Sequence, residues 1–173
     1  MICRSSSFIT DRLVVGEWRS LSVSDKDMFN AIAAILTPTV TQSLPEDWRG
    51  EYSVHRAARW LENIDQEAAI LLVLDRSSEN PIGLMILFES VEERSGRIVR
   101  IGYMLAESSW GNGYATELLQ GFVSWCKKME IASVIGGVER DNVASQRVME
   151  KNGFGILPNE QSHGELLYEL RLQ

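Results

Sequence analysis

The clearest chemical signal in this sequence is a turn with two glycines, in the run Trp110-Gly111-Asn112-Gly113-Tyr114-Ala115. The glycines lack the Cβ atoms that keep a backbone from curling closely around a ligand. A helix is predicted to follow directly, and the first N–H groups of a helix have no intrahelical partners. These amides, together with the positive end of the helix dipole, favour an anion such as a pyrophosphate. The same pattern also occurs in turns that are only tight connections.

Two familiar phosphate-binding motifs do not fit this turn. A P-loop ends in Gly-Lys-Ser/Thr, and a dinucleotide-binding fingerprint has a third glycine near the start of a βαβ unit. The run has neither feature. It therefore indicates a different phosphate-bearing cofactor.

A strand before the turn and a helix after it must hold it in place. Residues 97–105 predict the strand, which joins two earlier strands through short polar connections and so forms an antiparallel meander. Residues 114–130 predict the helix, because Leu118, Phe122 and Trp125 recur on one face.

The rest of the chain alternates between helical and strand periods. Strands are predicted at 12–18 (an edge strand), 70–74, 82–89, 133–138, 154–157 and 165–172, and helices at about 25–36, 54–64 and 142–152. Ser24 is the expected N-cap of the first helix, Pro38 follows its end, and a long loop is expected over 38–53. Residues 1–9 are expected to be loose, leaving one domain over 10–173.

Composition narrows the class of protein. The chain has 173 residues, 45% of them hydrophobic, and a net charge of −7, which suits one globular domain. The negative charge disfavours nucleic acid and anionic membranes as partners and suits a cationic substrate, although it could equally serve only solubility. No run is long enough to span a membrane, so we expect a cytoplasmic protein. Cys3 and Cys126 are expected to be free thiols, and no metal-ligand spacing is present.

Two motifs together resemble the GNAT superfamily of acetyl-CoA-dependent N-acetyltransferases. They are IGYMLAESSWGNGYATELL and, about 30 residues later, ERDNVASQRVMEKNGFG. The opening Thr10-Asp11-Arg12-Leu13-Val14-Val15, with Trp110 at the loop, is similar to the subfamily that acetylates the N-terminal alanine or serine of ribosomal proteins. The resemblance runs from about Thr10 and is loose over 38–68.

The resemblance implies a fold and a set of donor-binding residues. The fold is a single α/β domain whose mixed, mostly antiparallel central sheet has helices on both faces. Acetyl-CoA would lie where the central strand diverges from the next one. The backbone of Tyr103, Met104 and Leu105 would bind its pantetheine arm, although the side chains could be plain core residues. The amides from Gly111 to Ala115 would hold the pyrophosphate, beside Trp110, which replaces the family's usual Arg or Gln. Asn142 could contact the cofactor, cap its helix, or do both.

For the chemistry, the resemblance places Ser145 near the cofactor sulfur, where its hydroxyl could protonate the departing thiolate. The family's usual tyrosine, seven residues after Asn142, is replaced by Met149. Candidate bases are, in order, Glu160, Glu107 and Glu89. The family builds its acceptor pocket near Trp48, Tyr52 and Trp60, so we expect Trp48, Tyr52 and Glu89 to border the substrate, although the tryptophan could instead pack the loop onto the body of the protein.

The predicted reaction is direct acetyl transfer to a primary amine, because no serine or cysteine stands beside an obvious histidine base. A protein N-terminus is favoured, since an α-amino group has a pKa of about 7.7–8.0 and needs less help from a base than lysine at about 10.4. A small amine, such as an antibiotic or polyamine, is the alternative acceptor. A non-catalytic acetyl-CoA-binding module is the alternative class. The protein is expected to be a monomer or a homodimer.

Overall fold

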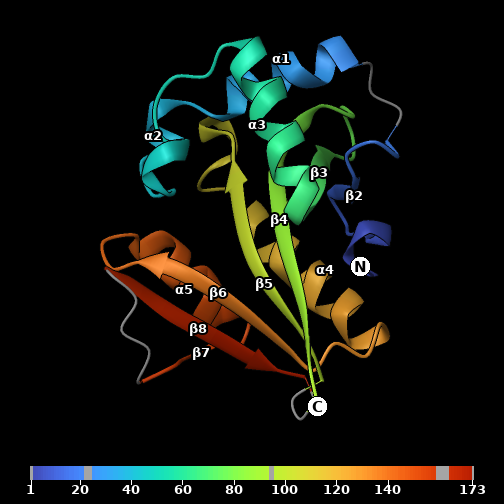
Figure 1. The fold of residues 1–173 in the computed structure, drawn as a ribbon, viewed down its shortest axis with the longest axis vertical. Helices are drawn as coiled ribbons and strands as arrows, with labels where there is room; N and C mark the ends of the chain where they lie inside the picture. Colours follow the sequence, from blue (N-terminus) through green and yellow to red (C-terminus); the bar gives the residue numbers. More distant parts are fainter. Residues whose placement is uncertain (1, 22–24, 94–95, 159–163, 173) are drawn as a thin grey trace.

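One eight-stranded sheet organises the computed structural model, which describes residues 2–21, 25–93, 96–158 and 164–172 (Figure 1). The strands are β1 (Ser7–Ile9), β2 (Leu13–Glu17), β3 (Ala69–Asp75), β4 (Pro81–Glu92), β5 (Gly96–Leu105), β6 (Ser133–Glu139), β7 (Gly155–Ile156) and β8 (Glu165–Arg171). They lie in the order β1-β2-β3-β4-β5-β6-β8-β7, and every neighbouring pair is antiparallel except β5 and β6. The predicted mixed, mostly antiparallel sheet is confirmed.

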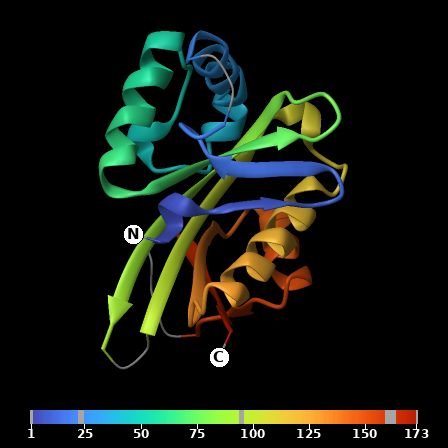
Figure 2. The same ribbon diagram turned by 90° about the vertical axis from the view of Figure 1, so that its right-hand side faces the viewer.

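Helices cover both faces of this sheet, as predicted (Figure 2). The longer ones are α1 (Asp25–Ile35) and α3 (Val54–Glu67) on one face, and α4 (Tyr114–Lys128) and α5 (Val143–Lys151) on the other. The short ones are α2 (Pro38–Thr41) and the 3-10 turns η1 (Ile2–Ser5), η2 (Glu46–Trp48) and η3 (Glu107–Ser109). The sheet therefore separates two helix layers, each with its own hydrophobic core.

The sequence of β3 shows why two cores form. Its residues alternate between the faces: Leu71 and Val73 pack in the α4 core, whereas Ile70 and Leu72 pack in the α1–α3 core. All four are fully buried. A strand covered on both faces reads as a continuous apolar run, which is what residues 70–74 show.

The sheet opens between its only parallel pair in the described chain. β5 and β6 pair only from Ile98 with Ser133 to Ile101 with Gly136. β5 then runs on to Leu105 and β6 to Glu139, and Figure 1 shows the two strands diverging. Beyond Ile101, this edge of β5 is no longer paired to β6, so its peptide groups are available to a ligand.

The first residues of the chain differ from the prediction of a loose N-terminus at 1–9. β1 pairs with β2, Cys3 is buried, and the Phe8 ring packs against Phe122 with centroids 6.3 Å apart. Gly121 permits this approach, because a Cβ there would lie 2.7 Å from Thr10 Cγ2 and 2.8 Å from Phe8 Cε2. A polar, serine-rich composition hid this packing. β1 takes the edge of the sheet, so the prediction that residues 12–18 form an edge strand is wrong.

The predicted loop at 38–53 is partly helical. Pro38 is the first residue of α2, where its missing N–H costs nothing, and Thr37 Oγ1 accepts a hydrogen bond from Val40 N at 3.2 Å. The preceding helix α1 ends at Ile35, before the proline as predicted, while its expected cap Ser24 lies outside the described residues. Helix α3 continues three residues past the predicted end, to Glu67.

Two further expectations concern the whole described chain. Cys3 and Cys126 are both free and buried. Over residues 2–21, 25–93, 96–158 and 164–172, no helix is long and apolar enough to cross a membrane, and no group of three His, Cys, Asp or Glu is placed to hold a metal ion.

Candidate active site

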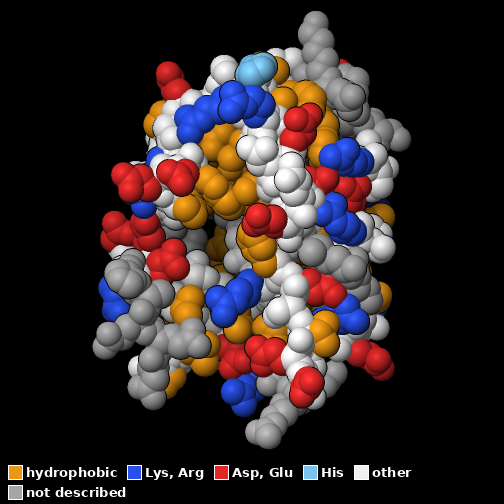
Figure 3. Space-filling view, viewed as in Figure 1, with side chains coloured by type: hydrophobic (Ala, Val, Ile, Leu, Met, Phe, Trp, Pro, Cys, Tyr) orange, Lys and Arg blue, Asp and Glu red, His pale blue; other side chains and the backbone are white. Residues whose placement is uncertain are grey.

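A cavity of about 1010 Å³ lies where β5 and β6 part. It is lined by the end of β5, the glycine turn before α4, the end of β6, one side of α5, and residues between 39 and 49. Figure 3 shows this face of the molecule hollowed near its centre, with hydrophobic side chains gathered above the hollow. The cavity therefore brings together segments from both sides of the sheet.

The glycine turn forms one wall of this cavity as a positive-φ bend. Gly111 has φ +73° and Gly113 has φ +79°, and Gly113 is the residue that precedes the first turn of α4. A side chain at either position would be strained. A Cβ at Gly111 would meet no heavy atom within 4 Å, so there is open space for a ligand beside the backbone. The turn and the first amides of α4 thus fit a pyrophosphate.

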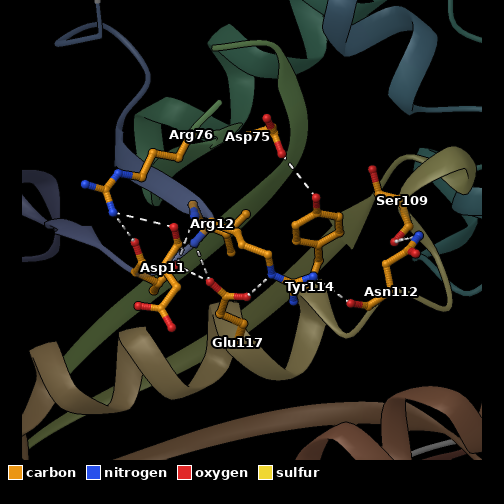
Figure 4. A network of polar contacts seen from close by, with 10 residues as sticks. Asp11, Arg12, Asp75, Arg76, Ser109, Asn112, Tyr114 and Glu117 are labelled. Atoms are coloured by element: carbon orange, nitrogen blue, oxygen red, sulfur yellow. Dashed lines mark hydrogen bonds and ion pairs between the residues drawn. The ribbon is translucent and has the colours of Figure 1, made fainter. Parts of the chain in front are cut away.

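Arg12 holds this turn from behind (Figure 4). Its Nη1 donates to Asn112 O at 2.9 Å, and its Nε donates to Glu117 Oε2 at 2.6 Å. Its guanidinium lies over the Tyr114 ring, 4.3 Å from the centroid, and Tyr114 OH donates to Asp75 Oδ2 at 3.1 Å. The network joins the segment before β2, the glycine turn, the first turn of α4 and the end of β3, so the shape of the turn does not depend on the turn alone.

Glu117 is the carboxylate at the centre of this network. It also accepts hydrogen bonds from Thr10 Oγ1 at 2.6 Å and from Arg12 N at 2.8 Å. Partial burial raises its pKa, but the hydrogen bonds from Thr10 and Arg12 outweigh that effect and hold the pKa below its usual value. Glu117 is thus a fixed anion in the first turn of α4, where it complements the helix dipole.

The predicted residues of β5 lie on the cavity wall. Tyr103, Met104 and Leu105 all line it, and Trp110 Nε1 donates to Leu105 O at 2.9 Å. Tyr103 packs partly in the α4 core, whereas Met104 is buried in the α1–α3 core. Their side chains thus have packing roles on opposite faces, while their peptide groups stand at the opening between the strands.

Across the opening, α5 presents Ser145 to the cavity. Asn142 caps this helix, its Oδ1 accepting from Ser145 N at 3.1 Å. The Tyr103 hydroxyl donates to Ser145 Oγ at 3.3 Å. Burial raises the pKa of Tyr103, so its hydroxyl stays protonated at neutral pH. Two hydroxyl groups therefore meet at the base of the cavity.

Met149 occupies the place of the family's usual tyrosine. It is buried and packs against β6, where its Cε would lie 2.3 Å from a Cβ at Gly136. The glycine is what makes room for the methionine. Position 149 therefore contributes packing and no proton donor.

The three predicted base candidates are placed differently. Glu107 lies in η3 and accepts from Thr37 Oγ1 at 3.2 Å, and it is not among the residues that line the cavity. Glu160 lies outside the described residues.

Glu89 is a structural carboxylate. Its side chain is 6% exposed, forms an ion pair with Arg97, and accepts from Cys3 N at 3.1 Å. Burial raises its pKa, yet the hydrogen bonds from Cys3 and Arg97 hold the pKa below its usual value. It does not line the cavity, so the expectation that it borders the substrate does not fit the structure.

The two predicted aromatic wall residues pack into the body of the protein. Trp48 and Tyr52 both contact Trp60 edge-to-face, with ring centroids 5.4 Å and 6.0 Å apart, and Tyr52 OH donates to Trp48 O at 2.9 Å. Neither lines the large cavity; Tyr52 lines a smaller one of about 390 Å³ beside α1 and α2. The segment 38–53 does reach the large cavity, through other residues, including Gln42 and Arg49.

The charged residues of the cavity, Asp141 among them, were missed at the level of the sequence. Arg147 and Lys151 lie one turn apart on α5, a spacing that could have marked them as a pair of phosphate ligands. Arg49 and Glu139 also line the cavity and contact each other. They are 90 residues apart, so no local pattern predicts their contact.

Comparisons with known proteins agree with this arrangement. A model of the acetyltransferase (GNAT) domain matches residues 18–155. The fold and this match define an acetyltransferase. The chain belongs to the GNAT family, as its two motifs predicted, and it is an N-acetyltransferase that uses acetyl-CoA. A search of curated protein sequences found no significant match.

Solved structures share the fold over nearly the whole chain. A GNAT-family acetyltransferase from Bacillus anthracis has a TM-score of 0.75 at 20% identity, covering 96% of this chain and 99% of that one. RimL, a ribosomal L7/L12 alpha-N-protein acetyltransferase in complex with coenzyme A, has a TM-score of 0.71 at 16% identity, covering 95% and 96%. A ribosomal-protein-S5-alanine acetyltransferase from Vibrio fischeri has a TM-score of 0.63 at 15% identity, covering 97% of each chain.

Proposed function

We propose that this enzyme transfers the acetyl group of acetyl-CoA directly to the α-amino group of a protein N-terminus. The observation that carries the proposal is the single cavity shared by the glycine turn, Ser145 and the segment 39–49, which come from opposite faces of the sheet. Such a cavity suits a ternary complex, with the donor reaching the opening from one face and the acceptor from the other.

The donor half of the proposal rests on backbone groups. Acetyl-CoA supplies an activated acetyl thioester and two kinds of phosphate. The amides from Gly111 to Ala115 suit the pyrophosphate, and the exposed side chains of Arg147 and Lys151 add positive charge on the facing wall. Along 103–105, β6 no longer pairs with β5, and the peptide groups on that edge suit the amide groups of the pantetheine arm, except the Leu105 carbonyl, which accepts from Trp110.

The proton-transfer half rests on Ser145. Because Tyr103 donates to Ser145 Oγ, the serine proton is free to point into the cavity towards a departing thiolate. The proton that the acetylated nitrogen releases balances the one that the serine gives up, while Tyr103, whose pKa burial raises, keeps its own. The acceptor needs less help: an α-amino group has a pKa of about 7.7–8.0, so an appreciable fraction is already neutral at neutral pH.

The N-terminal acceptor draws support from two sources. The opening at Thr10 to Val15 resembles that of the ribosomal-protein subfamily, and two of the structural neighbours are ribosomal-protein acetyltransferases. Arg12 of that opening holds the glycine turn, so the motif has a physical role at the donor site.

A matched set of amines tests the proposal. The enzyme is offered a peptide with a free N-terminal alanine or serine and an internal lysine, the same peptide with its N-terminus already acetylated, and spermidine. Mass spectrometry is expected to locate the new acetyl group on the α-amine, with kcat/KM at least about tenfold above those of the other two substrates. Faster acetylation of spermidine, or of the lysine in the blocked peptide, would contradict the proposal.

A further inference from the structure

An ion pair joins two walls of the cavity that come from distant parts of the chain. Arg49, directly after η2, places its Nη2 3.1 Å from Oε1 of Glu139, the last residue of β6. Both residues line the cavity. The ion pair therefore links the segment 38–53 to the end of β6.

Strand alternation places this pair on the face opposite Ser145. Val138 lies in the core under α4 and α5, and Gly136 faces Met149 of α5. Side chains of neighbouring residues on a strand point to opposite faces, so Glu139 points to the face of α1–α3. The proposed proton donors, Ser145 and Tyr103, belong to the α5 side. Glu139 therefore lies on the side from which an amine would approach a thioester held beside Ser145.

The pair is easily displaced. The Arg49 side chain is 47% exposed and that of Glu139 is 26% exposed, and ion pairs in contact with water contribute little to stability. Arg49 also donates from Nε to Leu44 O at 2.7 Å, so its guanidinium keeps a partner when Glu139 is released. A competing cation can therefore replace Arg49 at the Glu139 carboxylate with little loss of stability.

Other acidic groups lie near this carboxylate. A primary alkyl amine is mostly protonated at neutral pH and carries the same charge as the guanidinium that it would replace. Among the described residues, Asp141 also lines the cavity, and a Cβ at Gly137, on the same face as Glu139, would lie 2.7 Å from Glu165 Oε2. The basic residues Arg147 and Lys151 line the cavity from α5, on the proposed phosphate side.

We propose that Glu139 first binds the acceptor as an ammonium ion, which loses a proton before it attacks, and that Arg49 occupies this carboxylate until the acceptor arrives. This assignment rests on the proposed function only in requiring a primary amine as acceptor. Glu139 is thus an acceptor-binding residue. Arg49 competes with the amine for this carboxylate and so weakens acceptor binding.

Steady-state kinetics on three variants test this assignment, with the best acceptor from the amine panel. Glu139→Gln is expected to raise the acceptor KM by about tenfold or more and to leave the acetyl-CoA KM within about twofold. Arg49→Met removes the competitor, so its acceptor KM is expected to equal or fall below that of the parent. Glu169→Gln breaks a similar ion pair on β8, with Arg171, and is expected to change neither KM.

Two results would overturn the assignment. One is an unchanged acceptor KM in Glu139→Gln. The other is an equal rise in acceptor KM for Glu139→Gln and Arg49→Met. An ion pair that only stabilises the loop would be broken equally by either substitution. A panel in which the parent enzyme prefers spermidine defeats the N-terminal proposal but leaves this test intact, since spermidine also carries ammonium groups.

Discussion

Ser145 is the residue whose surroundings say most about the chemistry. Its backbone N–H is bound by Asn142, which fixes the start of α5, and its hydroxyl accepts from Tyr103 on β5. The helix cap involves the backbone N–H of Ser145, whereas proton transfer involves its side-chain hydroxyl. A substitution can therefore remove the hydroxyl without removing the cap.

Ser145→Ala is expected to lower kcat by about 10–100-fold, because general acid catalysis typically contributes factors of this size or larger. The acetyl-CoA KM is expected to stay within about threefold, since the backbone contacts persist. Tyr103→Phe, which removes only the second hydroxyl, is expected to lower kcat less. Steady-state kinetics with both substrates varied give these values. Ser124→Ala is the control, because that hydroxyl donates within α4 to Gln120 O. An unchanged kcat in Ser145→Ala would remove this serine from the mechanism.

Glu89 is a residue that stabilises the folded protein. Its pKa is held below the usual value in the folded state by Cys3 N and Arg97. A depressed pKa stabilises the fold above the unfolded-state pKa, and the contribution is lost as pH falls through the folded-state pKa.

Glu89→Gln is therefore expected to lower the free energy of unfolding by about 1–3 kcal/mol at pH 7, because it breaks a buried charged contact. The difference from the parent is expected to shrink as the pH falls from the pKa of an unfolded glutamate, about 4.3, through the lower pKa of Glu89 in the folded state. Urea unfolding at several pH values measures both effects. A large loss of kcat/KM in a variant of unchanged stability would instead return Glu89 to the active site.

Prediction from sequence succeeded at residues whose partners are close along the chain. The glycine turn and the Asn142 cap are local patterns, and both lie where the sequence placed them. Arg49 and Glu139 were missed because their contact depends on the path of a loop and the alternation of a distant strand. Trp48 was predicted to face the substrate, but its large apolar ring packs against Trp60 instead.

At the scale of elements, residues from other parts of the chain stabilise the junction between β5 and α4. Arg12, beside β2, reaches both the turn and the first turn of α4. Tyr114 is tied to Asp75 at the end of β3. The amides of the turn are thus held ready before any ligand binds, which reduces the entropy lost on binding.

Arg12→Met is expected to raise the acetyl-CoA KM by about tenfold while kcat and the acceptor KM stay within about twofold, since Arg12 supports the turn and does not touch the reacting groups. Initial rates with each substrate varied provide the comparison. Arg76→Met is a matched control, because Arg76 contacts Thr10 O and Asp11 O but not the turn. Equal acetyl-CoA KM values for the parent and Arg12→Met would show that the turn keeps its shape unaided.

Elements with a strong period were predictable, and those fixed by tertiary contacts were not. The apolar run of β3 and the broad apolar stripe of α4 predicted a strand and a helix, with bounds close to those observed. β1 has three residues, and its place depends on its pairing with β2 and on the contact of Phe8 with Phe122. α2 is four residues long and depends on the Thr37 cap, a signal hidden by the proline that ended the previous helix.

At the scale of the whole molecule, one parallel strand pair in an otherwise antiparallel sheet creates the site. β5 and β6 pair over four residues and then part, and the cavity forms between them. The family resemblance implied this divergence, but the width of the cavity and the residues that reach it depend on the three-dimensional path of 39–49. The central claim is that acetyl-CoA binds in this opening.

A crystal structure of the protein with coenzyme A tests that claim most directly. The predicted result is a pyrophosphate on the amides from Gly111 to Ala115, with the pantetheine arm along 103–105 and the sulfur near Ser145. Coenzyme A bound away from the glycine turn, with the space between β5 and β6 left to other groups, would contradict it.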